Sequence, residues 1–376
     1  MISIHKRPPQ ILLSDAPAWF EVSNTGEDKK VQAVISTGGQ QITSLYSFAS
    51  VNNRAYFELS EVFSSVLDGS YEFSVMQGQI AAPLTGGLFK TFSVVFSDSL
   101  ENELSEEITV VAGSLSPDLI KKVLGANFTF TQWLEQNPFL TFRPKDINVY
   151  YPGQTENLYL CSPIGQGSIT ASMTISFCDG TGFSKILGSF TPAINTVYKI
   201  FCSYEAHIQG QLPSDFDGKK VSSYKIWFSS SINGLLKTFH YHYMPSDLAK
   251  GCFVFLNSIG GYDTFCPMGA KSISSSVSLD YDQTIIAPES NESFYRVSGH
   301  KTHQVITQNT GMLPASQAKW LSQLIFSKRA LWRPRSGGVL PISLIGNKLD
   351  FKEVKSKLYA ADIKYIINPV LSPEVQ

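Results

Sequence analysis

The chain has 376 residues, of which 43% are hydrophobic and only 16% are charged, and its formal net charge is −1. This length is too great for one ordinary core and predicts two or three domains. A charge near zero, without a long basic run, argues against electrostatic binding to nucleic acid. No run of about 18 apolar residues occurs, so no membrane-spanning helix is predicted.

The first ten residues, MISIHKRPPQ, carry charge but no apolar segment follows them, so we predict no signal peptide. The five cysteines are odd in number and show no C-x-x-C spacing; they are Cys161, Cys178, Cys202, Cys252 and Cys266. Most lie in apolar strand patterns, where free cysteine behaves as a small hydrophobic residue. We therefore expect neither a disulfide framework nor a zinc site, and a protein made in a reducing cytoplasm.

Residues 1–112 are predicted to form a first β-sandwich-like domain. Short runs rich in Val, Ile, Phe and Tyr are separated by turn residues, a pattern typical of sandwiches. The predicted strands are 19–22, 31–35, 42–48, 71–76, 91–96 and 108–111. One interruption at 59–67 has its apolar residues on one helical face, which predicts a short helix with Ser60 as N-cap and Gly69 after its end.

Residues 113–250 are predicted to form a second β-sandwich-like domain. It opens with a predicted helix from Ser116 to Gly125. The predicted strands are 139–142, 158–161, 169–178, 196–202, 222–229 and 236–243. In the run SITASMTISF, apolar residues alternate with Ser and Thr, as expected of a half-buried strand.

Residues 251–376 are predicted to form a small β-rich (α+β) domain. Its first stretch, GCFVFLNSIGGYDTFCPMG, predicts two strands joined by a turn at Gly260 and Gly261. Further strands are predicted at 272–279, 294–297, 339–345 and 358–367, and one amphipathic helix near 315–327. The fold class is thus mainly β: two sandwich-like domains and a β-rich C-terminal domain.

The sequence shows no catalytic signature such as G-x-S-x-G or a phosphate-binding glycine loop. His240 and His242 are spaced to share one face of a strand, and without an evident third ligand a sheet-surface role is favoured over metal binding. Carboxylate pairs for glycosidic chemistry can be drawn from Glu156, Asp179 and Glu205, as from any acid-containing β-protein. We predict no catalytic residue, no cofactor and no metal site.

Exposed aromatic residues could stack on sugar rings. Trp133, Trp227 and Trp332 are candidates, and Trp133 and Trp332 are the predicted glycan-binding residues. An aromatic residue within a strand pattern is more often part of a core.

Several motifs occur in a fixed order along nearly the whole chain. They are FELSEVFSSVL (57–67), WLEQNPFLTFRP (133–144), QTENLYL (154–160), FLNSIGGYDTF (255–265), AKWLSQLIFSKRALWRP (318–334) and PISLI (341–345). In this order the chain resembles a group of proteins encoded among the structural genes of tailed bacteriophages and prophages, especially those of Bacteroidetes hosts. The last third also resembles the ending of tail-tip proteins such as distal-tail components. The resemblance carries no catalytic residues with it.

The resemblance implies a structural virion protein of a tail tip or baseplate, made in the host cytoplasm and located in the virion tail. Such a protein would assemble with copies of itself as a ring or trimer, contact other tail proteins, and connect the tail to fibres or adhesins. The first alternative is a glycan-binding adhesin, to which the sandwiches and tryptophans point. The second alternative is a polysaccharide depolymerase, which no motif supports.

Overall fold

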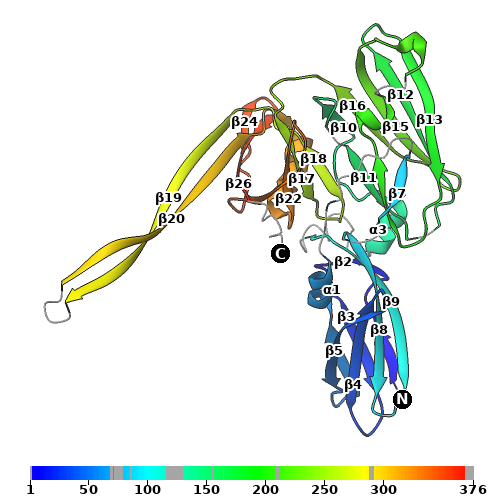
Figure 1. Ribbon diagram of the computed structural model, residues 1–376. Helices are drawn as coiled ribbons and strands as arrows, with labels where there is room; N and C mark the ends of the chain where they lie inside the picture. Colours follow the sequence, from blue (N-terminus) through cyan, green and yellow to red (C-terminus); the bar gives the residue numbers. More distant parts are fainter. Residues whose placement is uncertain are drawn as a thin grey trace, which may run out of the picture. The chain divides into compact units, whose positions relative to one another are not determined.

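The computed structural model describes residues 2–67, 71, 79–84, 87–115, 130–154, 156–163, 165–208, 212–287 and 292–368, with backbone alone for 276–303. The fold is mainly β, as the sequence predicts (Figure 1). The chain divides into two compact units. Unit 1 comprises residues 1–246, 255–264 and 326–328, and unit 2 comprises 247–254, 265–325 and 329–376. Among the described residues, no helix has the length and apolar character to cross a membrane.

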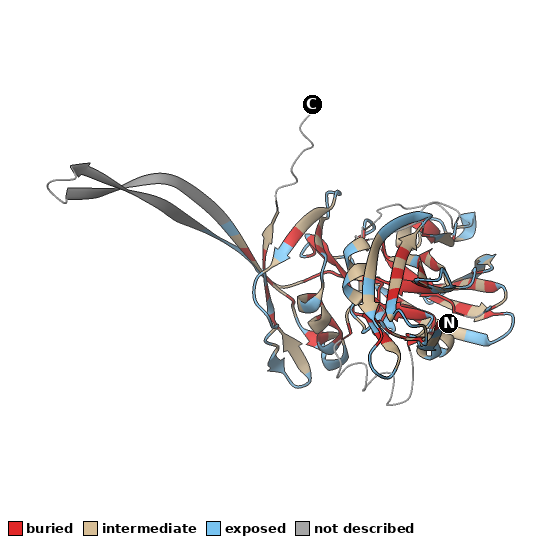
Figure 2. Ribbon diagram, turned by 90° about the horizontal axis from the view of Figure 1, so that it is seen from below, coloured by how far each residue is buried: buried red, intermediate tan, exposed pale blue. Residues whose placement is uncertain are grey.

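The first sandwich of unit 1 packs a three-stranded sheet against a five-stranded sheet. The small sheet has the order β1 (Ile2–Lys6), β3 (Trp19–Asn24), β6 (Arg54–Glu58). The large sheet has the order β2 (Ile11–Leu13), β9 (Glu103–Val111), β8 (Phe89–Asp98), β4 (Lys30–Thr37), β5 (Gln40–Phe48). Alternate residues of these strands are buried (Figure 2). The core therefore follows from the period-two pattern of the sequence.

The helix predicted at 59–67 is found as α1 (Ser60–Val66). Its apolar face includes Phe63, which is fully buried against Phe92 with ring centroids 4.6 Å apart. The predicted N-cap is wrong by one residue, because Leu59 takes that position and makes no side-chain cap. The Ser60 hydroxyl instead donates to Oε2 of Glu58 at 2.8 Å.

The second sandwich, also in unit 1, has a five-stranded and a three-stranded sheet. The large sheet has the order β10 (Asp146–Val149), β16 (Gly234–Tyr243), β15 (Val221–Ser230), β12 (Ile169–Phe177), β13 (Gly182–Phe190). The small sheet has the order β11 (Asn157–Cys161), β14 (Val197–Phe201), β7 (Ala81–Pro83). Strand β7 precedes the predicted domain boundary at residue 112, yet it pairs with β14 of the second sandwich.

Three short helices accompany this sandwich: α3 (Phe130–Gln136), α4 (Tyr204–His207) and the 3₁₀ turn η1 (Ser214–Phe216). The clearest predicted strand, at 169–178, is confirmed as β12, with alternate residues buried. The predicted strand at 139–142 is reduced to one bridge between Phe139 and Leu160. The predicted helix at 116–125 and most of the predicted strand at 71–76 lie outside the described residues.

Unit 2 is built on a seven-stranded sheet. Its order is β18 (Tyr262–Phe265), β17 (Gly251–Leu256), β22 (Ala330–Pro334), β23 (Leu340–Leu344), β26 (Asp362–Ile367), β20 (Glu292–Asn309), β19 (Lys271–Ala287). A small sheet has the order β21 (Leu313–Pro314), β25 (Leu358–Ala360), β24 (Lys352–Lys355). The predicted amphipathic helix near 315–327 is found as α5 (Ala315–Leu321), which continues as the 3₁₀ segment η2 (Ser322–Phe326).

The β17–β18 hairpin is buried along its whole length, from residue 251 to residue 267. The chain passes between the two units within this hairpin, because residues 255–264 belong to unit 1. Gly260 has a φ of 94°, and a Cβ atom there would collide with the Val111 side chain. A Cβ atom at Gly261 would collide with the carbonyl oxygen of Leu140. The paired glycines of the sequence are thus required by close packing as well as by the turn.

The prediction that the cysteines form no disulfide is wrong for one pair. Cys252 and Cys266, 14 positions apart, are joined by a disulfide within unit 2. Their pairing follows from the hairpin, which brings its two strands side by side, and a search for C-x-x-C spacing cannot detect it. Of the remaining cysteines, Cys161 and Cys202 are buried and Cys178 is exposed.

Candidate functional site

The long hairpin β19–β20 forms an arm on unit 2. The two strands pair with each other from Lys271 opposite Gln308 to Ala287 opposite Glu292. Strand β26 pairs with β20 only along Ile306–Asn309. In the described structure, the part of the arm that includes residues 292–305 of β20 therefore has no third strand. Figure 1 shows this part leaving the rest of the unit 2 sheet. At about 3.3 Å per residue, this part is about 45 Å long.

The sequence of the arm alternates with period two. In the sequence of β19, Val277, Leu279, Tyr281, Gln283 and Ile285 alternate with Ser276, Ser278, Asp280, Asp282, Thr284 and Ile286, so the first set is the more apolar. The register pairs Val297 with Tyr281 and Tyr295 with Gln283 of the first set, which also pairs with Thr302, His300 and Ser293, and it pairs Phe294 with Thr284 of the second. The arm is therefore an amphipathic two-stranded ribbon. Such a ribbon is marginally stable in water unless something packs on its apolar face.

Strand β5 is an exposed sheet edge in unit 1. It ends the order of its five-stranded sheet, so one side of its backbone has no strand partner in the described structure. Its sequence, QQITSLYSF, contains no charged residue and no proline, which are the usual protections of an edge strand. The side chains of Tyr46 and Phe48 are 54% and 69% exposed. Lys30 Nζ lies 4.3 Å from the centroid of the Tyr46 ring.

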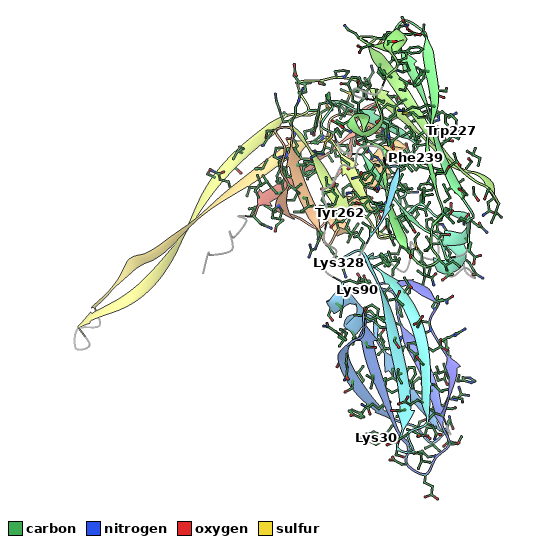
Figure 3. The ribbon with its side chains drawn as sticks, turned by 45° about the vertical axis from the view of Figure 1, so that its right-hand side comes forward. Lys30, Lys90, Trp227, Phe239, Tyr262 and Lys328 are labelled. Carbon is green, nitrogen blue, oxygen red and sulfur yellow. A yellow bond between two sulfur atoms is a disulfide. The ribbon has the colours of Figure 1, made fainter. Side chains whose placement is uncertain are left out.

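A third open surface is the outer face of the sheet β10-β16-β15-β12-β13. Trp227 lies near its centre, opposite Ser172 on β12 and Thr238 on β16. Lys225, two residues earlier on the same face, places Nζ 5.7 Å from the centroid of the Trp227 ring. The neighbouring Phe239, opposite Ile226, points into the core instead and is fully buried (Figure 3).

Most other residues on this face carry hydroxyl groups. They are Thr170, Ser172, Thr174, Ser176, Ser184, Ser189, Ser223, Ser229 and Thr238. Two pairs are hydrogen-bonded across strands: Thr170 with Ser189 and Thr174 with Ser184, each with oxygen atoms 2.8 Å apart. These bonds orient the hydroxyls, and each hydroxyl retains capacity for a further donor or acceptor.

His240 and His242 lie on this same face, as their spacing predicts. His240 is opposite both Lys225 and Asp146, and His242 is opposite Asn148. His242 Nε2 is 3.5 Å from Oδ1 of Asp146. Among the described residues, no group of three or more His, Cys, Asp or Glu side chains is arranged to hold a metal ion.

The two predicted glycan-binding tryptophans, Trp133 and Trp332, differ in how far they are buried. Trp332 is only 4% exposed, and its ring packs against Phe253 and Tyr365 at centroid distances of 5.0 and 5.8 Å. This burial argues against Trp332 as a sugar platform, because a sugar can stack only on a ring that has one face open to solvent. Trp133 on α3 is half-buried, stacked 6.0 Å from Phe130. Its role in glycan binding stays a prediction.

The candidate carboxylate Glu156 lies in a buried polar cluster instead of a cleft. It forms an ion pair with Arg143, and the two side chains are only 1% and 8% exposed. Gln154 Nε2 donates to Oε1 of Glu156 at 2.6 Å. Burial raises the pKa of the Glu156 carboxyl, and the adjacent Arg143 guanidinium opposes part of that rise. A pair enclosed in this way has no access to substrate.

Asp179 lies in an exposed turn. Its carboxylate accepts hydrogen bonds from the backbone N–H and the hydroxyl of Thr181, at 2.9 and 2.6 Å. Lys219 Nζ is 2.9 Å from its other oxygen. These donors lower the pKa of Asp179, with the Thr181 hydroxyl as the largest cause.

No protein-family model matches the chain, and no curated protein matches it. Among solved structures, it is similar to the tail of an empty GTA particle with C6 symmetry, with 11% identity, 34% of this chain and 97% of that chain covered, and a TM-score of 0.22. It is also similar to fibronectin(III)-like modules of CbhA from Clostridium thermocellum, with 9% identity, 65% and 94% covered, and a TM-score of 0.16. A tetra-tandem repeat from the extending region of a large adhesion protein matches with 10% identity, 97% and 80% covered, and a TM-score of 0.22. These scores are too low to support an argument about function.

Proposed function

We propose that this chain is a structural subunit of a phage-type tail tip or baseplate, which assembles with copies of itself and connects the tail to fibres or adhesins. The observation that carries the proposal is the amphipathic arm β19–β20. Its more apolar set of residues continues past the end of the pairing between β20 and β26, and a two-stranded ribbon of this length requires a packing partner. The role is structural rather than catalytic, and its place is the virion tail after synthesis in the host cytoplasm.

The proposed packing partner is a second copy of the chain, and the proposed acceptor is the edge strand β5. That strand offers unpaired backbone groups beside the exposed Tyr46 and Phe48. An incoming strand can satisfy such an edge by main-chain hydrogen bonds and cover its aromatic residues. The arm and the β5 edge are different surfaces of the chain. Repetition of this contact therefore forms a head-to-tail ring when the rotation between successive copies closes on itself.

The ordered motifs of the sequence support the same proposal. The region FLNSIGGYDTF at 255–265 coincides with the buried tip of the β17–β18 hairpin, and AKWLSQLIFSKRALWRP covers α5 and β22. The second of these motifs lies mostly in unit 2, which bears the arm, whereas the first lies almost entirely in unit 1.

Light scattering on the purified chain and on an arm-less variant tests the proposal. In the variant, residues 276–303 are replaced by Asn-Gly, which joins Ser275 to its partner Gln304 through a two-residue turn. The full chain is expected to form a discrete oligomer, and the variant a folded monomer. A full chain that is monomeric at all concentrations, or an arm-less variant that assembles normally, contradicts the proposal.

A matched pair of point variants separates the two faces of the arm. The triple substitution Val277→Ser, Leu279→Ser and Tyr281→Ser changes the apolar face, whereas Ser276→Ala and Ser278→Ala change the opposite face. Only the first set is expected to abolish the oligomer. Equal loss in both sets would show that the arm does not dock through its apolar face.

A further inference from the structure

We infer that the outer face of the sheet β10-β16-β15-β12-β13 is a binding site for a neutral glycan, with Trp227 as its stacking platform. This site is independent of the arm and of the β5 edge. Its ring belongs to Trp227, one of the three candidates from the sequence, and to neither Trp133 nor Trp332, the two predicted glycan-binding residues. The register of the sheet places hydroxyl-bearing residues around the outward-facing indole ring of Trp227.

The apolar part of the site consists of two side chains, Trp227 and Ile186, on either side of Ser172. Trp227 and Ile186 are both opposite Ser172, one from each neighbouring strand, so they flank it on the same face. Ile186 is 71% exposed. A pyranose ring has an apolar C–H face that packs on an indole ring, and these two side chains provide room for one sugar on Trp227 and contact for the next on Ile186.

The polar part of the site surrounds these two side chains. Lys225 and His240 are one row away from Trp227 and Thr238, which is about 7 Å along the strands. In the other direction, Thr170 and Ser229 occupy the next row. Sugar hydroxyls at the rim of a stacked ring both donate and accept hydrogen bonds, and the hydroxyl, imidazole and ammonium groups of these rows supply matching partners.

The charge of the face selects a neutral ligand. Lys225 and Asp146 are its fixed charges, and both lie in one row across the sheet with His240 between them. The two opposite charges cancel, so the face attracts neither a polyanion nor a polycation. Nucleic acid is disfavoured because phosphate binding needs several unopposed Lys or Arg residues.

A protein partner is disfavoured by the same composition. The buried centre of a protein interface is enriched in aromatic and other apolar residues and depleted in serine. Here the large apolar side chains are Trp227, Ile186 and Leu235, the last opposite Ser229, and most of their neighbours on four strands carry hydroxyl groups. This combination of one aromatic platform with many oriented hydroxyls is complementary to a polyhydroxylated chain.

Binding of the full chain to a panel of neutral and anionic oligosaccharides tests the inference, with Trp227→Ala as the variant. Trp19→Ala is the matched control, because Trp19 is an exposed tryptophan, 49% accessible, on the first sandwich. We expect at least one neutral oligosaccharide to bind, Trp227→Ala to weaken that binding about tenfold or more, and Trp19→Ala to leave it unchanged. Trp227→Phe, which keeps a ring, is expected to retain most of the binding.

Four results would overturn the inference. Binding to no neutral oligosaccharide excludes the site, and binding to anionic ones alone contradicts the charge argument. Equal weakening by Trp227→Ala and Trp19→Ala contradicts the location. Circular dichroism of each variant confirms that it is folded, and light scattering of Trp227→Ala reveals whether the face instead joins two copies, which also overturns the inference.

Discussion

Thr141 donates a hydrogen bond from Oγ1 to Oδ1 of Asp263 across 2.7 Å, although the two residues are 122 positions apart. Beside it, Asn257 Nδ2 donates to the carbonyl oxygen of Leu140 at 2.9 Å. Both bonds are buried, and both hold the tip of the β17–β18 hairpin to the segment that follows α3. The stretch that stands out most in the sequence is thus anchored in unit 1 by specific polar contacts.

Removal of the Thr141 hydroxyl is expected to destabilise unit 1. Thr141→Val leaves the buried Asp263 carboxylate with one donor fewer, and a hydrogen bond to a charged group contributes about 1.5–3 kcal/mol. Urea unfolding measures the change in the free energy of unfolding. Thr174→Val is the control, because its partner Ser184 is on the exposed sheet face and the expected change is within about 0.5 kcal/mol. Equal effects of the two substitutions would contradict this role of Thr141.

The buried ion pair Arg143–Glu156 gives a second prediction. Glu156→Gln removes the ion-paired carboxylate from the buried Arg143 guanidinium, and loss of one partner of a buried pair costs about 3–5 kcal/mol of unfolding free energy. Glu106→Gln removes the partner of Arg7 in an exposed pair, for which about 0–1 kcal/mol is expected. Urea unfolding of both variants compares the two costs. A loss below about 1 kcal/mol in Glu156→Gln would show that the pair is not important for stability.

We expect the buried His207 to make the free energy of unfolding depend on pH. Burial lowers its pKa below the usual value of 6.5, and its hydrogen bond to the carbonyl oxygen of Phe201 only partly opposes this. The unfolded chain therefore binds a proton at this residue more readily than the folded chain. The unfolding free energy should fall as the pH falls below about 6.5, down to the lowered folded pKa.

Urea unfolding of the wild-type chain and His207→Gln between pH 8 and pH 5 measures this dependence. The variant should lose the part of the slope that His207 contributes, because glutamine does not titrate. Identical slopes in the two proteins would exclude His207 as the cause.

The five cysteines should react with an alkylating reagent in three stages. In the folded protein, Cys178 alone is expected to react, because burial raises the pKa of Cys161 and Cys202 to about 12 and prevents access. Unfolding without reductant should expose those two, and a reductant should then release Cys252 and Cys266 from their disulfide. Mass spectrometry counts the labels. Five labels without reductant would contradict the disulfide.

Local periodicity was sufficient to predict the elements whose environment is set by their own sequence. Strand β12 and helix α1 are examples, since each shows the spacing of apolar residues that its structure requires. Strand β13 was missed because Gly182 and Gly188 interrupt its pattern, and Gly188 lies at the register shift of its pairing with β12. The predicted strands at 272–279 and 294–297 are parts of β19 and β20, whose full length depends on their pairing with each other.

The candidate sites depend on tertiary relationships that a single sequence does not contain. Trp332 and Trp227 both occur in strand patterns, but only the sheet order shows that Trp332 faces the core and Trp227 faces outward. The disulfide between Cys252 and Cys266 likewise depends on which strands are neighbours. The shared face of His240 and His242 was predictable, because two residues of one strand need only the period of that strand.

The most direct test of the proposed assembly is the solution mass of the full chain beside that of the variant in which Asn-Gly replaces residues 276–303. We expect a discrete oligomer for the full chain and a folded monomer for the arm-less variant, because the variant lacks the part of β19–β20 proposed to dock. The same mass for both proteins would contradict it, whether that mass is a monomer or an oligomer.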